Sequence, residues 1–220
     1  SIYEEYLEWY PYVEVPYRVK ELVLEQGNIR ISCPQIEGLS DNGIQGKWNR
    51  IFLGAEERTM DEWDASGAYE AGFEVKTMTA DVLSILMSGR FYEGDTEQPC
   101  VFRYTYNIDL NTGESIRLAD YVDVSKVAED LFAGRGYYVE ETLAPYFEER
   151  IHAIYENPEM LSRSLEGYDY AEDGNSPYGY SYLKDGKVWI CMEVPHDLGD
   201  YIEIELEAQQ KENRKGAEEE

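Results

Sequence analysis

The stretch Val101–Phe132, VFRYTYNIDLNTGESIRLADYVDVSKVAEDLF, predicts a strand, a tight turn, a return strand and a helix in direct succession. It begins with a period of two, which separates the apolar residues Phe102, Tyr104, Tyr106, Ile108 and Leu110 from the polar residues Arg103, Thr105, Asn107 and Asp109. This period is that of a half-buried strand. Asn111-Thr112-Gly113 predicts the turn, because glycine adopts positive φ without steric cost. Ser115–Leu118 is expected to start the return strand.

An amphipathic helix is predicted directly after this hairpin. Asp123 is a suitable N-cap, because its carboxylate can accept hydrogen bonds from free backbone N–H groups of the first turn. Helical spacing joins the apolar residues that follow it, which are Val124, Val127, Ala128, Leu131 and Phe132. Hairpin and helix each present one apolar face, and each face needs the other to leave water.

Hairpins and helices also alternate along the rest of the chain. Strands are expected at 19–25 and 28–33, at 68–79 and 82–92, around the Asp185-Gly186 turn, and at 201–206. A helix capped by Ser40 or Asp41 has an apolar stripe of Ile44, Trp48, Ile51, Phe52 and Ala55, and further helices are expected at 139–155 and 158–165. Within the first of these, Pro145 either starts a new helix or kinks the existing one.

The fold class follows from this order of elements. We predict an α+β fold of antiparallel sheets built from hairpins with inserted amphipathic helices, rather than βαβ winding. Residues 1–17 are predicted to form an aromatic and acidic N-terminal arm, residues 18–206 the body, and residues 207–220 a charged tail. The body is either one unit or two lobes, 18–95 and 96–206.

The charge of the chain limits its partners. It has 46 Asp and Glu residues against 19 Lys and Arg residues, a formal net charge of -27. Repulsion from phosphate groups argues against nucleic acid and against anionic membrane surfaces. A cationic protein or a metal ion is compatible with this charge, and so is a simple role in keeping the surface soluble.

The cysteines and the chain start concern the cellular compartment. Cys33, Cys100 and Cys191 have no short-range spacing, so we expect buried small hydrophobes, with one disulfide between distant cysteines left open. The sequence has no apolar run of the ~18 residues that a membrane-spanning helix needs. Because the chain opens at Ser1 without an initiator Met, we expect a leader or membrane anchor upstream of it.

The sequence contains few residues suited to catalysis. His196 has Asp197 and Asp200 nearby, which is compatible with a metal or acid–base cluster and also with hydrogen bonding within a loop. Asp109–Glu114 resembles the start of a calcium loop, but its twelfth position is Asp120 instead of the usual Glu, and a hairpin fits better. We therefore predict no catalytic residue, metal site or cofactor.

Binding is the more informative hypothesis. Tyr178, Tyr180 and Tyr182 share one strand face, which is either packed under other elements or exposed as an aromatic platform for protein or glycan. The preceding loop contains Asp169 and Asp173, whose oxygens could bind a hard cation or simply be solvated. These five residues are the candidate binding residues.

Several short motifs recur in the order known from one protein family. They are Pro34–Leu39 with Gln45 and Asn49, Leu83-Ser84-Ile85, the run from Asn107 to Asp120, Tyr180–Lys187, and Gly199-Asp200-Tyr201. Together they span about residues 12–206 and resemble a family of bacterial extracytoplasmic domains. That family includes the lysozyme-sensing ectodomain of a membrane-anchored anti-sigma factor and the N-terminal module of a peptidoglycan deacetylase.

The resemblance implies an α+β ectodomain outside the cytoplasmic membrane, with no catalysis by this module itself. We therefore expect a non-catalytic binding or sensor domain of the bacterial cell envelope, whose partner is a cationic protein such as lysozyme or cell-wall glycan. No lysozyme-contacting residue of the family is transferred to a position of this sequence. The alternatives are a glycan-acting enzyme using His196, Asp197 or Asp200, an accessory module of a deacetylase, and a structural spacer.

Overall fold

A computed structural model describes residues 15–63, 67–92 and 98–207 of the chain. The first sheet contains, in spatial order, β1 (Arg18–Gln26), β2 (Ile29–Glu37), β3 (Tyr69–Met78), β4 (Val82–Phe91) and β5 (Cys100–Asp109). The second contains β6 (Tyr137–Tyr138), β9 (Tyr201–Leu206), β8 (Lys187–Glu193) and β7 (Tyr180–Lys184). The helices are α2 (Asn42–Glu62), α3 (Leu118–Tyr121), α4 (Val124–Phe132), α5 (Ala144–Ile154), α6 (Pro158–Glu166) and the 3-10 turn η1 (His196–Leu198).

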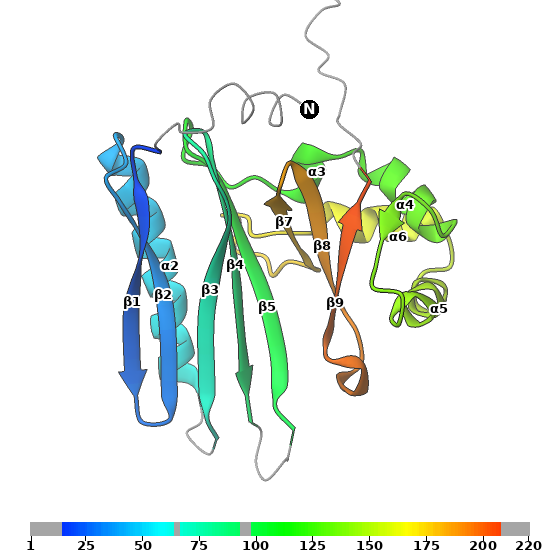
Figure 1. The fold of residues 1–220 in the computed structure, drawn as a ribbon, viewed down its shortest axis with the longest axis horizontal. Helices are drawn as coiled ribbons and strands as arrows, with labels where there is room; N and C mark the ends of the chain where they lie inside the picture. The colour runs from blue at the N-terminus through cyan, green and yellow to red at the C-terminus, as the bar shows by residue number, and fades with distance from the viewer. Residues whose placement is uncertain (1–14, 64–66, 93–97, 208–220) are drawn as a thin grey trace, which may run out of the picture.

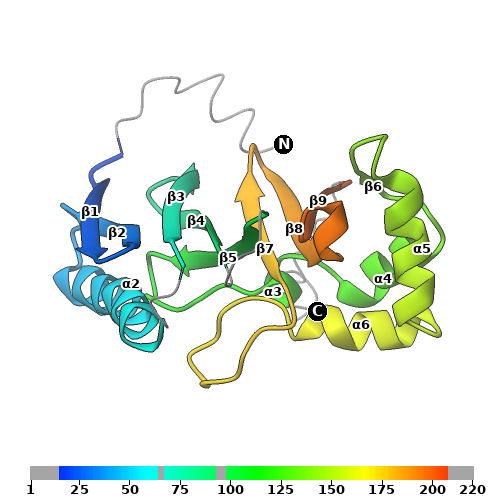
Figure 2. The same cartoon turned by 90° about the horizontal axis from the view of Figure 1, so that it is seen from below.

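The two sheets lie side by side, with helices along one side of the molecule (Figures 1 and 2). The predicted α+β class with mainly antiparallel hairpins is confirmed. The exclusion of βαβ winding is wrong in one unit, because Ile29–Ile31 of β2 pairs in parallel with Tyr69–Ala71 of β3. A parallel pair needs a long crossover, and α2 supplies it between these two strands.

The predicted subdivision of the chain is described only in part. Most of the arm at residues 1–17 and nearly all of the tail at residues 207–220 lie outside the described residues. The first sheet ends with β5, which lies beyond the boundary at residue 95 in the two-lobe alternative. Cys33 and Cys191 are fully buried, whereas Cys100 is partly exposed, and no disulfide joins these cysteines.

The core of the first sheet lies under α2. Asp41 caps this helix, since its Oδ1 accepts hydrogen bonds from the backbone N–H groups of Gly43 and Ile44. Trp48 and Phe52 are buried against β4 and β5, and the helix continues to Glu62, beyond the predicted apolar stripe. The Trp48 indole donates to the Gly113 carbonyl at 2.9 Å, which attaches the turn after β5 to α2.

The core of the second sheet lies against α4, α5 and α6. Residues of β8 and β9 that alternate along each strand point into it, namely Ile190, Met192, Ile202, Ile204 and Leu206. Asp123 caps α4 as predicted. The predicted helix at 139–155 begins only at Ala144, and Pro145 lies in its first turn, where its missing N–H is not needed.

The return strand predicted at Ser115–Leu118 is wrong. Gly113 has φ 76° and makes the expected turn, but only a single bridge, Ile108 to Ser115, follows it. Leu118 instead begins α3, and its backbone N–H donates to the Asp169 carboxylate at 2.8 Å. The Leu118 N–H, which would donate to a neighbouring strand in a hairpin, therefore donates to the side chain of the distant residue Asp169 instead.

The two sheets are joined through the free edge of β7. This strand pairs with β8 on one side only, yet the outward-facing backbone groups of Ser181 and Leu183 all have partners from outside the second sheet. The Ser181 N–H donates to Asp169 and its carbonyl accepts from Asn107. The Leu183 N–H donates to the Ser84 hydroxyl and its carbonyl accepts from Thr77.

These partners form one row across the first sheet. Thr77 pairs with Ser84, and Ser84 pairs with Asn107, so the three side chains lie on neighbouring strands at one level. The Ser84 hydroxyl also donates to Asn107 Oδ1 at 2.6 Å. Asn107 is only 2% exposed, so part of the polar side of β5 faces β7 rather than solvent.

Within the described residues, no helix is both long enough and apolar enough to span a membrane.

Replacing Ser84 by Ala should lower the free energy of unfolding by about 1–3 kcal/mol, because the partly buried Leu183 N–H then lacks its acceptor and the buried Asn107 Oδ1 loses a donor. Ser88→Ala is the matched control on the same strand and the same face, four residues further on, where the side chain is partly exposed. Its effect should be below about 0.5 kcal/mol. Urea unfolding of both variants measures the difference, and equal stabilities would contradict this role of Ser84.

Candidate functional site

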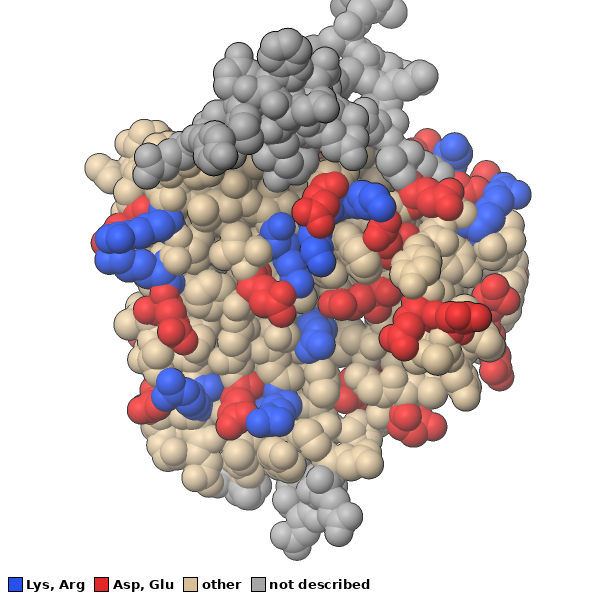
Figure 3. Space-filling model, in the orientation of Figure 1, with Lys and Arg blue, Asp and Glu red and all other residues tan. Residues whose placement is uncertain are grey.

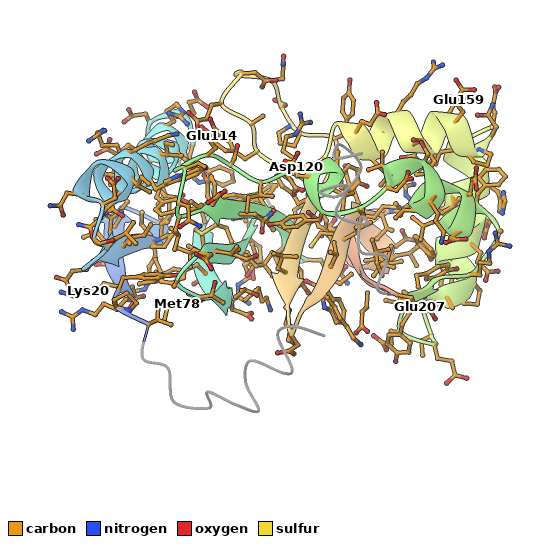
Figure 4. The ribbon with its side chains drawn as sticks, turned by 90° about the horizontal axis from the view of Figure 1, so that it is seen from above. Lys20, Met78, Glu114, Asp120, Glu159 and Glu207 are labelled. Carbon is orange, nitrogen blue, oxygen red and sulfur yellow. The ribbon has the colours of Figure 1, made fainter. Side chains whose placement is uncertain are left out.

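The loop between α6 and β7, residues 167–179, contains three of the five predicted binding residues, Asp169, Asp173 and Tyr178, and the other two, Tyr180 and Tyr182, lie in β7 directly after it. It lies on the helical side of the molecule, between α2 and α6 (Figure 2). Figure 4 shows Asp120 of α3 at the junction of the two halves, and Glu114 closer to α2. The candidate site is therefore located where the two sheets and the helical layer meet.

Asp169 is a structural junction rather than a solvated loop residue. Its side chain is buried, with 3% exposed, and its backbone has φ 74°. Oδ1 accepts hydrogen bonds from the Ser181 N–H and from the Thr105 hydroxyl, and Oδ2 accepts from the Leu118 N–H and the Ser181 hydroxyl. One carboxylate thus joins β5, α3 and β7.

Burial raises the pKa of Asp169 from 3.8 to about 6, although hydrogen bonds from Ser181, Leu118 and Thr105 act against this rise. Each carboxylate oxygen accepts one backbone N–H, and a backbone N–H cannot reverse its direction. The two backbone N–H groups therefore require that both oxygens of Asp169 accept hydrogen bonds. The low polarity around Asp169 nevertheless disfavours the negative charge of its ionised form.

The three tyrosines do not form one exposed row. Tyr178 is 74% exposed, Tyr180 is partly buried next to Tyr104, and Tyr182 is 2% exposed. The Tyr182 ring stacks on Trp189 with centroids 5.9 Å apart, and the Lys76 ammonium lies 5.2 Å from its centroid. Of the two alternatives for this row, packing under other elements holds for Tyr182, which lies in one cluster with Leu86 of the first sheet, whereas Tyr178 is exposed.

Three of the five predicted residues line one surface cavity of about 380 Å³. They are Asp169, Asp173 and Tyr178, and Arg117 forms part of the same wall. The Arg117 guanidinium donates hydrogen bonds to the carbonyls of Glu166 and Tyr168. The first of these bonds satisfies a carbonyl at the C-terminal end of α6 that has no partner within the helix. The cavity thus presents an aromatic ring beside groups of both charges, a surface suited to a polar ligand.

Asp173 is exposed and shapes the loop. It accepts a hydrogen bond from the backbone N–H of Asn175 at 3.0 Å, and this bond lowers the pKa of its carboxyl group. A hard cation would need several converging oxygens. No group of three or more His, Cys, Asp or Glu residues in the described parts of the chain is placed to hold a metal ion.

His196 lies apart from this cavity. Its Nδ1 is 3.0 Å from Asp200 Oδ1, and Asp200 Oδ2 accepts the Val101 N–H at 2.7 Å. Asp200 has φ 70° at the turn between η1 and β9. The pair thus fixes the loop after β8 against the start of β5. His152 is exposed on α5 beside the Phe132 ring.

Sequence patterns did not reveal the remaining residues of the site. Arg117 and Ser181 act through backbone groups, which leave no spacing signal in the sequence. Thr105 and Asn107 did carry a signal, the polar side of β5, but this pattern predicts solvent equally well. The sequence patterns also did not reveal Glu56, on the buried side of α2. Its carboxylate accepts a hydrogen bond from the Tyr104 hydroxyl, and burial raises the pKa of its carboxyl group.

Asp169→Asn should lower the free energy of unfolding by about 2–3 kcal/mol at pH 7, because the amide nitrogen cannot accept the backbone N–H that one carboxylate oxygen accepts now. Asparagine tolerates the left-handed backbone of this position, so the loss reports hydrogen bonding. Asp173→Asn is the exposed control in the same loop and should change stability by less than about 0.5 kcal/mol.

The pH dependence gives a second readout of Asp169. Its pKa of about 6 in the folded state exceeds the ordinary 3.8, so its contribution to stability falls as the pH rises between these two values. The stability advantage of the wild type over Asp169→Asn should therefore grow when the pH is lowered from about 7 to about 5. Urea unfolding at both pH values measures it, and a constant difference would contradict the raised pKa.

Comparison with known proteins gives a relationship at the level of fold. No family model and no curated protein matches the sequence. A solved structure of a DUF3298 family member from Bacteroides fragilis is similar, with a TM-score of 0.51, 12% identity, and coverage of 87% of this chain and 89% of that chain. A DUF3298 family protein from Pseudomonas aeruginosa has a TM-score of 0.47, 10% identity, and coverage of 88% and 91%.

At this identity, the similarity to the Bacteroides fragilis protein shows a shared fold. It agrees with the coarser part of the resemblance drawn from the sequence motifs, the α+β fold. The chain therefore has the architecture of a DUF3298 protein.

Proposed function

We propose that this chain is a non-catalytic extracytoplasmic binding domain of a bacterial cell-envelope protein, and that it recognises a cationic protein such as lysozyme. The observation that carries this proposal is the uneven distribution of charge between the two halves of the molecule. The motif resemblance implies the cell-envelope setting, and the α+β fold that it also implies is shared with a bacterial DUF3298 protein.

The negative charge is concentrated in the second half of the chain. Residues 118–207 carry 21 acidic and six basic side chains, whereas residues 15–117 carry 17 acidic and ten basic ones. On the face in Figure 3, basic and acidic side chains alternate over the first sheet, and acidic ones prevail on much of the other half. Such a field speeds the encounter with a cationic partner.

The helical lobe, residues 118–166 with α3–α6, combines this charge with exposed apolar groups. It has eleven acidic and four basic side chains. Tyr138, Tyr146, Ile154 and Met160 are between 41% and 63% exposed. Figure 4 shows Glu159 on α6 at the end of the molecule far from the first sheet. Exposed aromatic and aliphatic groups within a charged rim are typical of protein-binding surfaces.

Lysozyme should bind this chain at low salt and lose affinity steeply as salt is added. Between about 0.01 M and 1 M salt, the Debye length falls from ~30 Å to ~3 Å, which removes long-range attraction. We expect at least a tenfold rise in Kd over about this range, measured by calorimetry. No binding at low salt would remove lysozyme as the partner.

Charge reversal locates the binding surface. Glu149→Lys/Glu156→Lys changes two exposed residues of the helical lobe, and Asp61→Lys/Glu62→Lys makes the same change on exposed residues of α2. The first variant should weaken lysozyme binding about tenfold, because it reverses negative charges on the proposed binding surface. The second should weaken it by less than about threefold, because α2 lies outside that surface. Equal effects would mean that net charge alone drives the association.

The rival function, a glycan-acting enzyme, assigns a catalytic role to His196. The contact between His196 and Asp200 has a structural explanation, because Asp200 also accepts the Val101 N–H and so holds the loop after β8 against the start of β5. We therefore expect wild type and His196→Ala to give identical product profiles when incubated with peptidoglycan fragments and followed by mass spectrometry. Hydrolysis or deacetylation by the wild type that disappears in His196→Ala would establish the enzyme instead.

A further inference from the structure

A second cavity, of about 470 Å³, lies between α2 and the segment Tyr170–Glu172 of the candidate loop. Its walls include Lys47, Arg50 and Arg58 of α2, together with the rings of Tyr106 and Tyr170. It belongs to the half of the molecule where the acidic excess is smaller. Three cations in one cavity are unusual for a chain with net charge -27.

The three cations differ in their partners. The Lys47 ammonium is 2.6 Å from Glu172 and donates to the Gly113 carbonyl at 2.8 Å. Arg50 and Arg58 are exposed, and within the described parts of the chain neither guanidinium has an ion pair or a hydrogen bond. Lys47 is therefore held in place by the fold, whereas the two arginines are available to a ligand.

Two glycines of α2 lie next to these arginines. Gly46 and Gly54 each precede an arginine by four residues, and a Cβ built on them would lie 3.3 Å and 3.6 Å from Nη1 of Arg50 and Arg58, respectively. Each guanidinium thus extends along the helix over a glycine. A glycine inside a helix costs about 1 kcal/mol relative to alanine, so the smooth helix surface along this wall has an energetic cost.

The aromatic wall adds a polar group without a partner. Tyr106 is 5% exposed, and its hydroxyl has no hydrogen-bond partner among the described residues. Tyr170 packs edge-on against Trp48 and Tyr106, with centroids 6.0 Å and 5.5 Å apart. Burial and Glu172 raise the pKa of Tyr170, whereas Arg58 and Lys47 oppose this rise, so both cations interact with its hydroxyl.

We propose that this cavity binds a short acidic oligosaccharide, with carboxylates at Arg50 and Arg58 and a sugar ring against the tyrosines. Eight residues separate the arginines, which is ~12 Å along the helix axis, too far for one carboxylate to reach both. Guanidinium groups bind carboxylates through two parallel hydrogen bonds, and tyrosine rings pack on the apolar faces of sugars. A cavity of this volume is large enough for such a ligand.

This inference is independent of the proposed recognition of a cationic protein. The cavity lies along α2, on the side of the first sheet, and the acidic surface lies on the helical lobe with α3–α6. The long-range repulsion from the acidic half is screened at physiological salt, where the Debye length is about 8 Å. Either site can therefore fail its test without affecting the other.

Calorimetric titration with trigalacturonate tests the site. We expect saturable binding, at least tenfold weaker binding of the fully methyl-esterified trigalacturonate, and weaker binding of inorganic phosphate than of trigalacturonate. The ester keeps the sugar rings and removes the charges, and phosphate keeps a charge without rings. Equal affinity for the ester would overturn the role of the arginines, and equal affinity for phosphate would overturn the role of the sugar.

A pair of charge-matched variants assigns the binding to this cavity. Arg50→Gln/Arg58→Gln should weaken trigalacturonate binding about tenfold, since it removes two charge-assisted contacts. Arg30→Gln/Arg90→Gln removes two exposed arginines of the first sheet that pair with Glu25 and Glu70, and should leave binding within twofold. Thermal unfolding checks that all variants fold. Unchanged binding in the first variant, or equal loss in both, would overturn the proposal.

Discussion

The free edge of β7 is the constraint on which the rest of the structure depends. An edge strand with unpaired N–H and C=O groups must be solvated, paired or covered. Here polar side chains of the first sheet and of the loop, Thr77, Ser84, Asn107 and Asp169, supply one partner for each outward group of Ser181 and Leu183. The two sheets are thereby fixed to each other without a continuous strand ladder, and the loop before β7 is held at the junction.

This junction places two different surfaces on one domain. The helical lobe carries the acidic excess and exposed apolar side chains, whereas the cavity on α2 gathers cations beside tyrosines. The loop at residues 169–178 contributes Asp173 and Tyr178 to one cavity and Tyr170 and Glu172 to the other. Because Asp169 anchors this loop from within, both cavities depend on the hydrogen bonds that its carboxylate accepts.

Local chemistry in the sequence predicted the elements but not all of their neighbours. The N-caps Asp41 and Asp123 and the turn at Gly113 act over a few residues, so the sequence indicates them directly. The return strand after Gly113 failed because Asp169, about 50 residues away, binds the Leu118 N–H. The sequence did not decide between packing and exposure for Tyr182, because burial depends on which sheet lies opposite, here the first sheet with Leu86, and no periodicity contains that information.

By itself the sequence determined the α+β class, most strands and helices, and the strong acidity, because these depend on local periodicity, turn chemistry and composition. Only the tertiary structure decided that Thr105 and Asn107 face another sheet instead of water, that Asp169 is buried, and that Lys47, Arg50 and Arg58 share a cavity with Tyr170. The physical reason is that a polar side chain is equally compatible with solvent and with a buried hydrogen-bond partner. The choice between them depends on backbone groups that approach from distant parts of the chain.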